Sequence, residues 1–267
     1  MMISAASKVI GLLAVILGVV GVLYLCVEMF HQPSGPVCSL DQKPYSPVAA
    51  TFYTPANSEY RTSHSILASR WAQLSDIPLI TYEHFAELPS GRANPHRHHH
   101  WTGNPTKIDY VVRAMDEFQG HSHVIFMDCD VYPVKKIDHV VRMYRFSDLV
   151  CAQEGSFPRV RNIGFMSIKN TPRMKRFFTD LSARVEKYKL HDQAECLNML
   201  HESPDICSSV FRREHVCVFP CLKTKILPRT DDVVLVKPIR SNLNKTRTKS
   251  ETVNLLLEGS FWERLFA

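Results

Sequence analysis

Short apolar runs of strand length alternate along most of the chain with longer segments whose apolar residues recur at helical spacing. Strands are predicted at residues 48–53, 77–82, 123–127, 148–152, 164–168, 216–219 and 233–236. Helices are predicted at residues 58–75, 105–118, 172–190, from Asp192 onward, and at 250–257. Strands interleaved with helices are typical of an α/β domain with a mainly parallel sheet, in which ligands bind beyond the carboxyl ends of the strands.

The helix expected at residues 172–190 has the clearest apolar face. Thr171 is a suitable N-cap, and proline at position 172 suits the first helical turn. The apolar residues at helical spacing are Met174, Phe177, Phe178, Leu181, Val185 and Tyr188. We expect this face to pack in the core rather than to bind a cofactor.

A membrane segment is predicted near the amino terminus. The nineteen residues from Val9 to Val27 carry no charge, and the apolar stretch continues past Glu28 to Phe30. About 20 apolar residues span a bilayer, whereas a cleaved signal peptide, the alternative, has an apolar core of about 7 to 15 residues. The expected organisation is a cytosolic tail at 1–8, a transmembrane signal anchor at 9–30, a proline-rich stem at 31–47 and one globular domain at 48–267.

The flanking charges orient this anchor. Lys8 precedes the apolar segment and Glu28 follows it, which favours a cytosolic amino terminus and a single-pass type II protein. The globular domain is then lumenal, in the Golgi or alternatively the endoplasmic reticulum. The formal net charge of the 267 residues is +6, but nucleic acid is not an expected partner in that compartment.

Cysteine usage agrees with an oxidising compartment. The chain has 8 Cys, of which Cys26 lies in the predicted span, and the remaining odd number leaves at least one thiol unpaired or paired between chains. Cys217 and Cys221 lack the second ligand pair of a zinc site, so we expect a disulfide there.

Two carboxylates follow the apolar strand at 123–127. Asp128 and Asp130 are two residues apart, so on extended backbone they point to the same side. Like charges this close favour a bound cation, and oxygen ligands suit Mn²⁺ or Mg²⁺, whose remaining positions a diphosphate can fill. The alternative is that one Asp caps a turn and the other is solvated.

The segment Val124 to Val131 resembles the DxD region of Golgi-type glycosyltransferases with the GT-A fold, a Rossmann-like α/β fold with a mainly parallel sheet. The family that it resembles is the nucleotide-diphospho-sugar transferase family, which includes plant and algal α-xylosyl-, arabinosyl- and galactosyltransferases. The other matching positions are Lys107 before the DxD strand, Asn162 and Gly164 in an Asn-x-Gly-Phe segment, Asp192 and Gln193 in an Asp-Gln motif, and Leu256, Gly259 and Trp262 near the carboxyl terminus.

This resemblance implies a role for each matching residue. Asp128 and Asp130 would bind the metal, and the donor would contact both of them as well as Lys107, Asn162 and Gly164. Arg240 and Lys249 are predicted to contact the donor as well, because of their positive charge and not because of the resemblance. Asp192 and Gln193 would act at the transferred sugar, although Asp192 is also a suitable helix cap. In the physical alternative, Asn162 and Gly164 form an ordinary turn.

The chain departs from the family pattern at Arg240, where the family usually has a metal-binding His. Arginine does not ligate a metal but binds diphosphate well through its guanidinium. Arg240 belongs to a basic run that reaches from Lys237 to Lys249 without an acidic residue, which forms either a solvated face or a site that stabilises the leaving diphosphate.

Together these features predict a metal-dependent glycosyltransferase. It would move a sugar from a nucleotide-diphosphate donor, with UDP-sugars expected first, to a lumenal glycan or glycoprotein, and the resemblance implies retention of anomeric configuration. One alternative is a catalytically degenerate protein of the same fold, which Arg240 favours. A second is a phosphatase of the haloacid-dehalogenase type, whose first Asp is a nucleophile, although Tyr132 replaces the expected Thr or Val.

Overall fold

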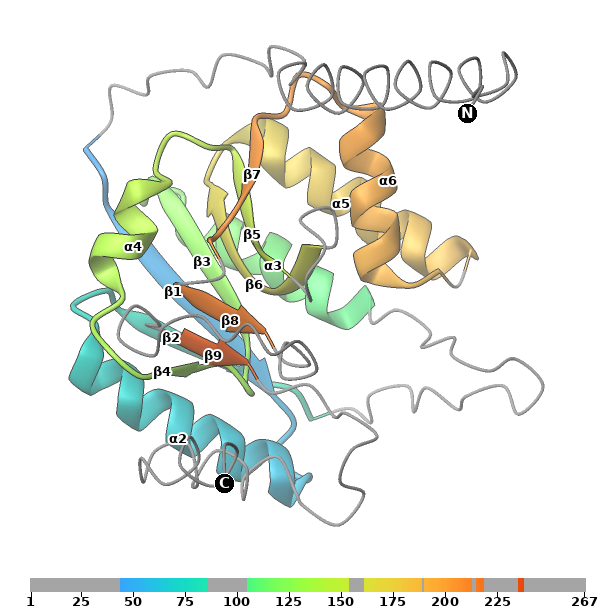
Figure 1. The fold of residues 1–267 in the computed structure, drawn as a ribbon. Coiled ribbons are helices and arrows are strands. Elements are labelled where there is room, and N and C mark those ends of the chain that lie inside the picture. The colour runs from blue at the N-terminus through green and yellow to red at the C-terminus, as the bar shows by residue number, and fades with distance from the viewer. Residues whose placement is uncertain are drawn as a thin grey trace, which may run out of the picture. The chain divides into compact units, whose positions relative to one another are not determined.

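A six-stranded sheet forms the centre of the domain (Figure 1), and its strand order is β2-β1-β3-β6-β5-β7. The structure is a computed structural model that describes residues 44–85, 105–153, 161–188, 190–212, 215–218 and 235–237. The strands are β1 (Pro47–Tyr53), β2 (Leu79–Glu83), β3 (His123–Asp128), β5 (Leu149–Gln153), β6 (Arg161–Lys169) and β7 (Ser208–Val210).

The sheet is mainly parallel, as predicted. Strand β1 pairs in parallel with β2 and β3, and β5 pairs in parallel with β7. Strand β6 is antiparallel to both of its neighbours, β3 and β5. The first residues of β6 therefore lie at the edge of the sheet where the parallel strands end.

Helices cover both faces of the sheet (Figure 1). Helices α3 (Pro105–Glu117), α5 (Pro172–Tyr188) and α6 (Asp192–Glu202) pack on one face, and α2 (Ser58–Leu74) and α4 (Asp138–Met143) pack on the other. Each face has its own apolar cluster, because successive strand residues point to opposite sides. Phe126 and Phe178 lie in the first cluster, and Met127 and Trp71 lie in the second.

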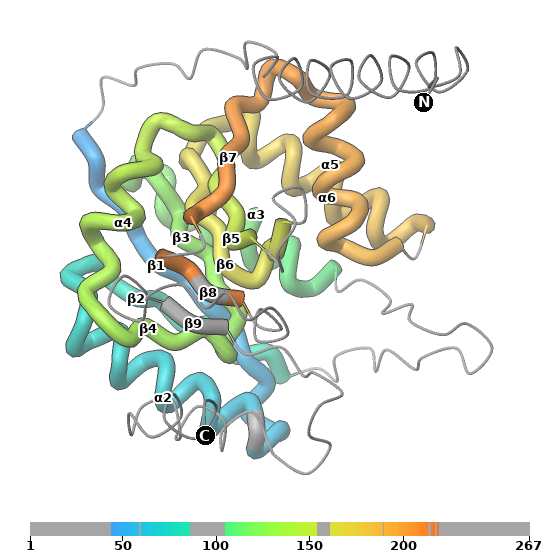
Figure 2. The backbone as a smooth tube through the Cα atoms, in the orientation of Figure 1, coloured from blue at the N-terminus to red at the C-terminus, as the bar shows by residue number. Residues whose placement is uncertain are grey.

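A second, three-stranded sheet (Figure 1) contains β4, the strand that comes after β3 along the chain, and Figure 2 shows the backbone path from β3 to β4. Strand β4 (Tyr132–Pro133) is antiparallel to β9 (Leu235–Lys237), which is parallel to β8 (Val216–Val218). Residues close to the carboxyl terminus are thereby hydrogen-bonded to a segment that begins directly after the Asp128–Asp130 pair.

The helix starts agree with the sequence prediction. Thr171 Oγ1 accepts a hydrogen bond from the Met174 backbone N–H at 3.3 Å, and Pro172 is the first residue of α5. The prediction that Tyr188 packs in the core was wrong, since this residue is 58% exposed. It is the last residue of α5, beyond the stretch that α3 and the sheet cover.

Three short elements were not predicted: β4, α4 and β7. Among the described residues, no helix is both long and apolar enough to cross a membrane. The predicted anchor at 9–30 and the predicted helix at 250–257 lie outside the described residues, as do most of the stem and the residue Cys221.

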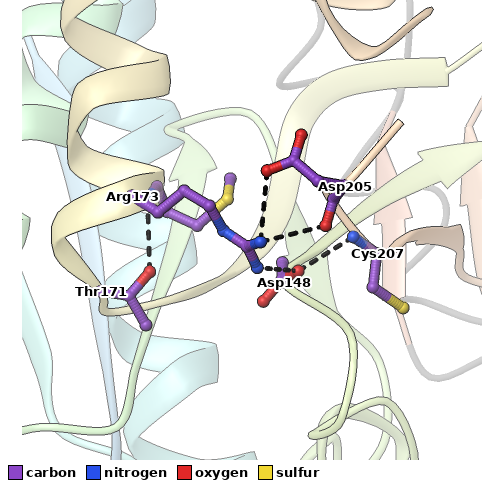
Figure 3. Close-up of polar contacts among 6 residues, drawn as sticks. Asp148, Thr171, Arg173, Asp205 and Cys207 are labelled. Atoms are coloured by element: carbon purple, nitrogen blue, oxygen red, sulfur yellow. Dashed lines mark hydrogen bonds and ion pairs between the residues drawn. The ribbon is translucent and has the colours of Figure 1, made fainter. Parts of the chain in front are cut away.

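A buried carboxylate ties the start of β5 to α5 and to the segment before β7 (Figure 3). Asp148 Oδ2 accepts hydrogen bonds from Arg173 Nη2 at 2.6 Å and from the Cys207 backbone N–H at 2.9 Å. Arg173 Nη1 also donates to the backbone oxygen of Asp205 at 3.0 Å. Cys207 itself is disulfide-bonded.

Candidate functional site

The candidate site lies where β3 ends, at the edge of the sheet predicted to bind ligands. Strand β3 is buried from His123 to Met127 and apolar from Val124 to Met127, and its last residue, Asp128, is partly exposed at the edge. The backbone then turns, with the Val131 N–H donating to the Asp128 carbonyl at 3.2 Å. Within this turn the side chain of Asp130 is buried, with the residue only 7% exposed.

Lys107 binds directly to the first carboxylate. It lies in the first turn of α3, and its Nζ is 2.9 Å from Asp128 Oδ1. The Lys107 side chain is 10% exposed and that of Asp128 is 26% exposed, so water screens the pair only in part. The structure thus brings together a cation and the carboxylate that the sequence separates by about twenty residues.

Asn162 and Gly164 form a hydrogen-bonded turn inside β6. Asn162 Oδ1 accepts a hydrogen bond from the Gly164 backbone N–H at 2.8 Å, and Asn162 is 6% exposed. This local bond from side chain to backbone is the turn that the sequence offered as the physical alternative. A contact between the amide group of Asn162 and a nucleotide-sugar donor is still compatible with this geometry.

Asp192 is the first residue of α6, and the helix cap predicted for it is wrong. The N-cap is His191, whose side chain makes no capping hydrogen bond. Asp192 Oδ1 instead accepts a hydrogen bond from the Gln193 backbone N–H at 2.9 Å. A carboxylate in the first turn still interacts favourably with the helix dipole. Both Asp192 and Gln193 are partly exposed at the start of α6.

Two buried thiols that the sequence did not single out show how these elements converge. Burial raises the pKa of the Cys151 thiol to about 12, and the positive charges of Arg161 and Lys107 act in the opposite direction. Burial also raises the pKa of Cys196, and the same two cations again oppose this effect. The thiol of Cys151 and the carboxylate of Asp192 raise the pKa of Cys196 further. Groups from α3, β5, β6 and α6 therefore lie within electrostatic reach of one another.

Aromatic side chains extend this edge beyond β1. Tyr53, the last residue of β1, stacks on His64 with ring centroids 4.2 Å apart and an interplanar angle of 1°. The Tyr53 hydroxyl donates to Glu83 Oε1 at 2.9 Å. Because Phe52 pairs with Asp128 across the sheet, the Tyr53 ring lies one strand away from the carboxylates. Aromatic residues are common in strands, so Tyr53 could not be recognised as a site residue from the sequence.

The two carboxylates fit a divalent cation in part. They supply the oxygen ligands that Mn²⁺ and Mg²⁺ prefer. Among the described residues, however, no three His, Cys, Asp or Glu side chains are grouped as ligands. Arg240 and Lys249, the two cations predicted to bind the donor, lie outside the described part of the chain.

A separate pocket of about 410 Å³ lies at the opposite edge of the sheet. It is lined by Tyr45 and Pro47 at the start of β1, by Pro78 before β2, and by Asp138 and Arg142 of α4. The start of a parallel strand is remote from its carboxyl end, where the site residues lie. This pocket is therefore not part of the candidate site.

The fold matches that of a solved sugar-transferring enzyme. A glycosyltransferase involved in the glycosylation of the major capsid of PBCV-1 superposes with a TM-score of 0.53 at 12% identity, covering 78% of this chain and 98% of that one. Mouse xyloside xylosyltransferase 1, in its apo form, gives a TM-score of 0.49 at 11% identity, with 75% and 99% covered. No curated protein sequence matches the chain.

The sequence family that the chain matches has the same activity as the solved structure of the same fold, namely sugar transfer. The family model for nucleotide-diphospho-sugar transferases matches residues 101–248, and the chain belongs to that family. The matched range contains every predicted site residue except Lys249, and it confirms the resemblance seen in the sequence. The prediction of a nucleotide-sugar-dependent transferase is confirmed with it, and the phosphatase alternative is set aside.

Proposed function

We propose that the protein is a membrane-anchored glycosyltransferase of the GT-A type that moves a sugar from a nucleotide diphosphate, in the first instance a UDP-sugar, to a lumenal glycan or glycoprotein. The observation that carries the proposal is the ion pair between Lys107 and Asp128 at the end of β3, with the buried Asp130 two residues further along the chain. The family match supports the reaction class, and the site residues support the roles given below.

The donor diphosphate would lie beside Asp128 and Asp130. A divalent cation bound there, Mn²⁺ or Mg²⁺, would neutralise charge that develops on the leaving diphosphate. Lys107 adds a fixed positive charge next to Asp128, so the carboxylate pair is not left uncompensated. Arg240 and Lys249 are proposed as further cations for the diphosphate, and Arg240 would replace the His that ligates the metal in the family.

The nucleobase and the sugar would lie on opposite sides of the diphosphate. The ring of Tyr53 supplies an aromatic surface near the end of β1 on which a base can stack. Asp192 and Gln193, at the start of α6, would bind sugar hydroxyl groups, and Asn162 and Gly164 would line the same subsite. We further propose retention of configuration, with Gln193 close to the anomeric carbon.

Anchoring by residues 9–30 would hold the domain in the Golgi lumen, or alternatively in the endoplasmic reticulum. The disulfide of Cys207 supports an oxidising compartment. Protease protection in intact microsomes tests the topology directly, since a lumenal domain survives digestion until detergent is added. Digestion of the domain without detergent would contradict the type II orientation.

The first test of the activity uses the full-length chain purified in detergent. UDP release would be measured from a panel of UDP-sugars with and without Mn²⁺, followed by GDP-sugars, and the product anomer would be assigned by NMR. Asp130→Asn should abolish release, whereas Asp180→Asn, a change of the same kind at an exposed position of α5, should leave it unchanged. Nucleotide binding without release from any donor would instead favour a degenerate binding protein, and an inverted product would exclude retention.

A further inference from the structure

Arg161 lies in the candidate site, although no sequence motif identified it. It is the first residue of β6 and pairs in register with Gln153 at the end of β5. Because β6 is antiparallel to β3 and β5, its first residue lies at the edge of the sheet where β3 ends in Asp128. Arg161 also directly precedes Asn162, which is a predicted donor contact.

One nitrogen of the Arg161 guanidinium is buried without an acceptor among the described residues. Its Nη1 is inaccessible to solvent and makes no hydrogen bond among the described residues. A buried N–H group without an acceptor is unfavourable, and more so on a charged group. Lys107 differs in this respect, because its charge is already paired with Asp128. A ligand that presents an anionic oxygen at this edge would satisfy Arg161.

The side chains around Arg161 indicate which part of a donor it would meet. Helix α6, which begins at Asp192, packs against β6, which begins at Arg161, and the charges of both residues act on the thiol of Cys196 in α6. Asp192 is proposed to bind the transferred sugar. In a nucleotide-diphospho-sugar the sugar is attached to the second phosphate, so a group beside the sugar subsite meets that phosphate and not the first.

We propose that Arg161 binds the sugar-linked β-phosphate of the donor through its guanidinium fork and holds this phosphate beside Asp192. A planar guanidinium matches two phosphate oxygens at once, which a lysine does not. The inference rests on the proposed function, since it assigns a new residue to the same donor. Arg161 is therefore a binding residue for the leaving group, supplied by the one reversed strand of the six-stranded sheet.

The test compares nucleotides with and without the β-phosphate. Calorimetry with the full-length protein in detergent would give affinities for UDP and UMP, and for GDP and GMP if guanosine is preferred. Arg161→Gln should weaken UDP binding about tenfold or more and change UMP binding by less than about threefold, since loss of a charged hydrogen bond is worth roughly that much. Arg161→Lys keeps the charge but loses the planar guanidinium, so its affinity for UDP should lie between those of the wild-type protein and Arg161→Gln.

A matched control is Arg176→Gln, which removes the same charge at an exposed position on α5 and should change neither affinity. Equal losses for UDP and UMP, or no loss for either, would overturn the role of Arg161 and leave the proposed function standing. A wild-type protein that binds no nucleoside diphosphate would overturn both. If Arg161→Gln does not fold, as judged by its melting curve, the ratio of UDP to UMP affinity in Arg161→Lys decides in the same way.

Discussion

Lys107 and Asp128 join the first turn of α3 to the last residue of β3 through an ion pair of 2.9 Å. The pair connects a helix that covers the sheet with the strand that carries the candidate metal ligands. Lys107 therefore both supplies charge to the site and holds Asp128 in position.

Substitution of Lys107 should impair the reaction more than the fold. Lys107→Met should lower UDP release about 100-fold, because a fixed cation beside the leaving group is lost. It should lower the free energy of unfolding by only about 1–2 kcal/mol, because the partly exposed Asp128 regains water. Urea denaturation and UDP release measure the two effects.

The control for this substitution is Lys175→Met. Lys175 forms an ion pair with Asp116 between α5 and α3, with both side chains about two-fifths exposed and away from the edge of the sheet. Its loss should leave UDP release unchanged. Equal activity of Lys107→Met and the wild-type protein would remove Lys107 from the site.

Two substitutions at Asn162 separate its turn from its proposed contact with the donor. Asn162→Ala removes the acceptor for the Gly164 N–H and should lower the free energy of unfolding by about 1–2 kcal/mol. Asn162→Asp keeps an oxygen acceptor and should nearly preserve stability, but it places a negative charge near the diphosphate and should lower activity at least about tenfold. Full activity in Asn162→Asp would mean that Asn162 serves the turn alone.

The network around Asp148 should affect stability and not activity (Figure 3). Asp148→Ala leaves the Cys207 N–H and Arg173 without their carboxylate and should lower the free energy of unfolding by about 2 kcal/mol. Arg173→Ala should cost about half as much, because Arg173 is 41% exposed. Denaturation midpoints, with UDP release per folded molecule as the control, test this, and an unchanged midpoint for Asp148→Ala would contradict it.

His64 should make the domain less stable in mild acid. Burial lowers the pKa of His64 below its ordinary value of about 6.5, while the charge of Glu83 acts in the opposite direction. Between the lowered pKa and about 6.5 the unfolded chain binds more protons than the folded one, so stability falls as the pH falls through this window. Below the lowered pKa this residue contributes no further change.

His64→Phe should remove that part of the pH dependence. The substitution keeps a ring against Tyr53 but removes the titrating nitrogen and the 2.9 Å hydrogen bond between Nε2 and Thr81 Oγ1. Urea midpoints at pH 5 and pH 7 should lie closer together in the variant than in the wild-type protein. The same pH difference in both proteins would exclude His64 as its source.

Much of the fold could be predicted because each long element carries its own local signal. The strand before Asp128 is apolar from Val124 to Met127, and the start of α5 has both a capping Thr171 and a proline at its first turn. Helix α4 was missed because its six residues make less than two turns, with charged Asp138 and Arg142 among them. Periodicity also does not reveal strand direction, so the reversal of β6 could not be predicted.

The candidate site was predictable only in part, for a related reason. Asp128 and Lys107 follow a recognisable order of motifs, but their contact depends on how α3 packs on the sheet. Arg161 carries no signal of its own, because its placement depends on the reversal of β6 and its missing acceptor is visible only in three dimensions. Asp192 was misjudged as a cap because His191 and Asp192 are adjacent and a sequence does not fix a helix boundary to one residue.

The two sides of the candidate site differ in how firmly the sheet holds their backbone. Arg161 and Asn162 pair with Gln153 and Ala152 of β5, so a shift of the backbone on that side would disrupt this pairing. Asp130 lies past the end of β3, in a turn outside the six-stranded sheet. Adjustment to donors of different size would then fall on the carboxylate side, while the Arg161 side acts as a fixed reference against which the diphosphate is aligned.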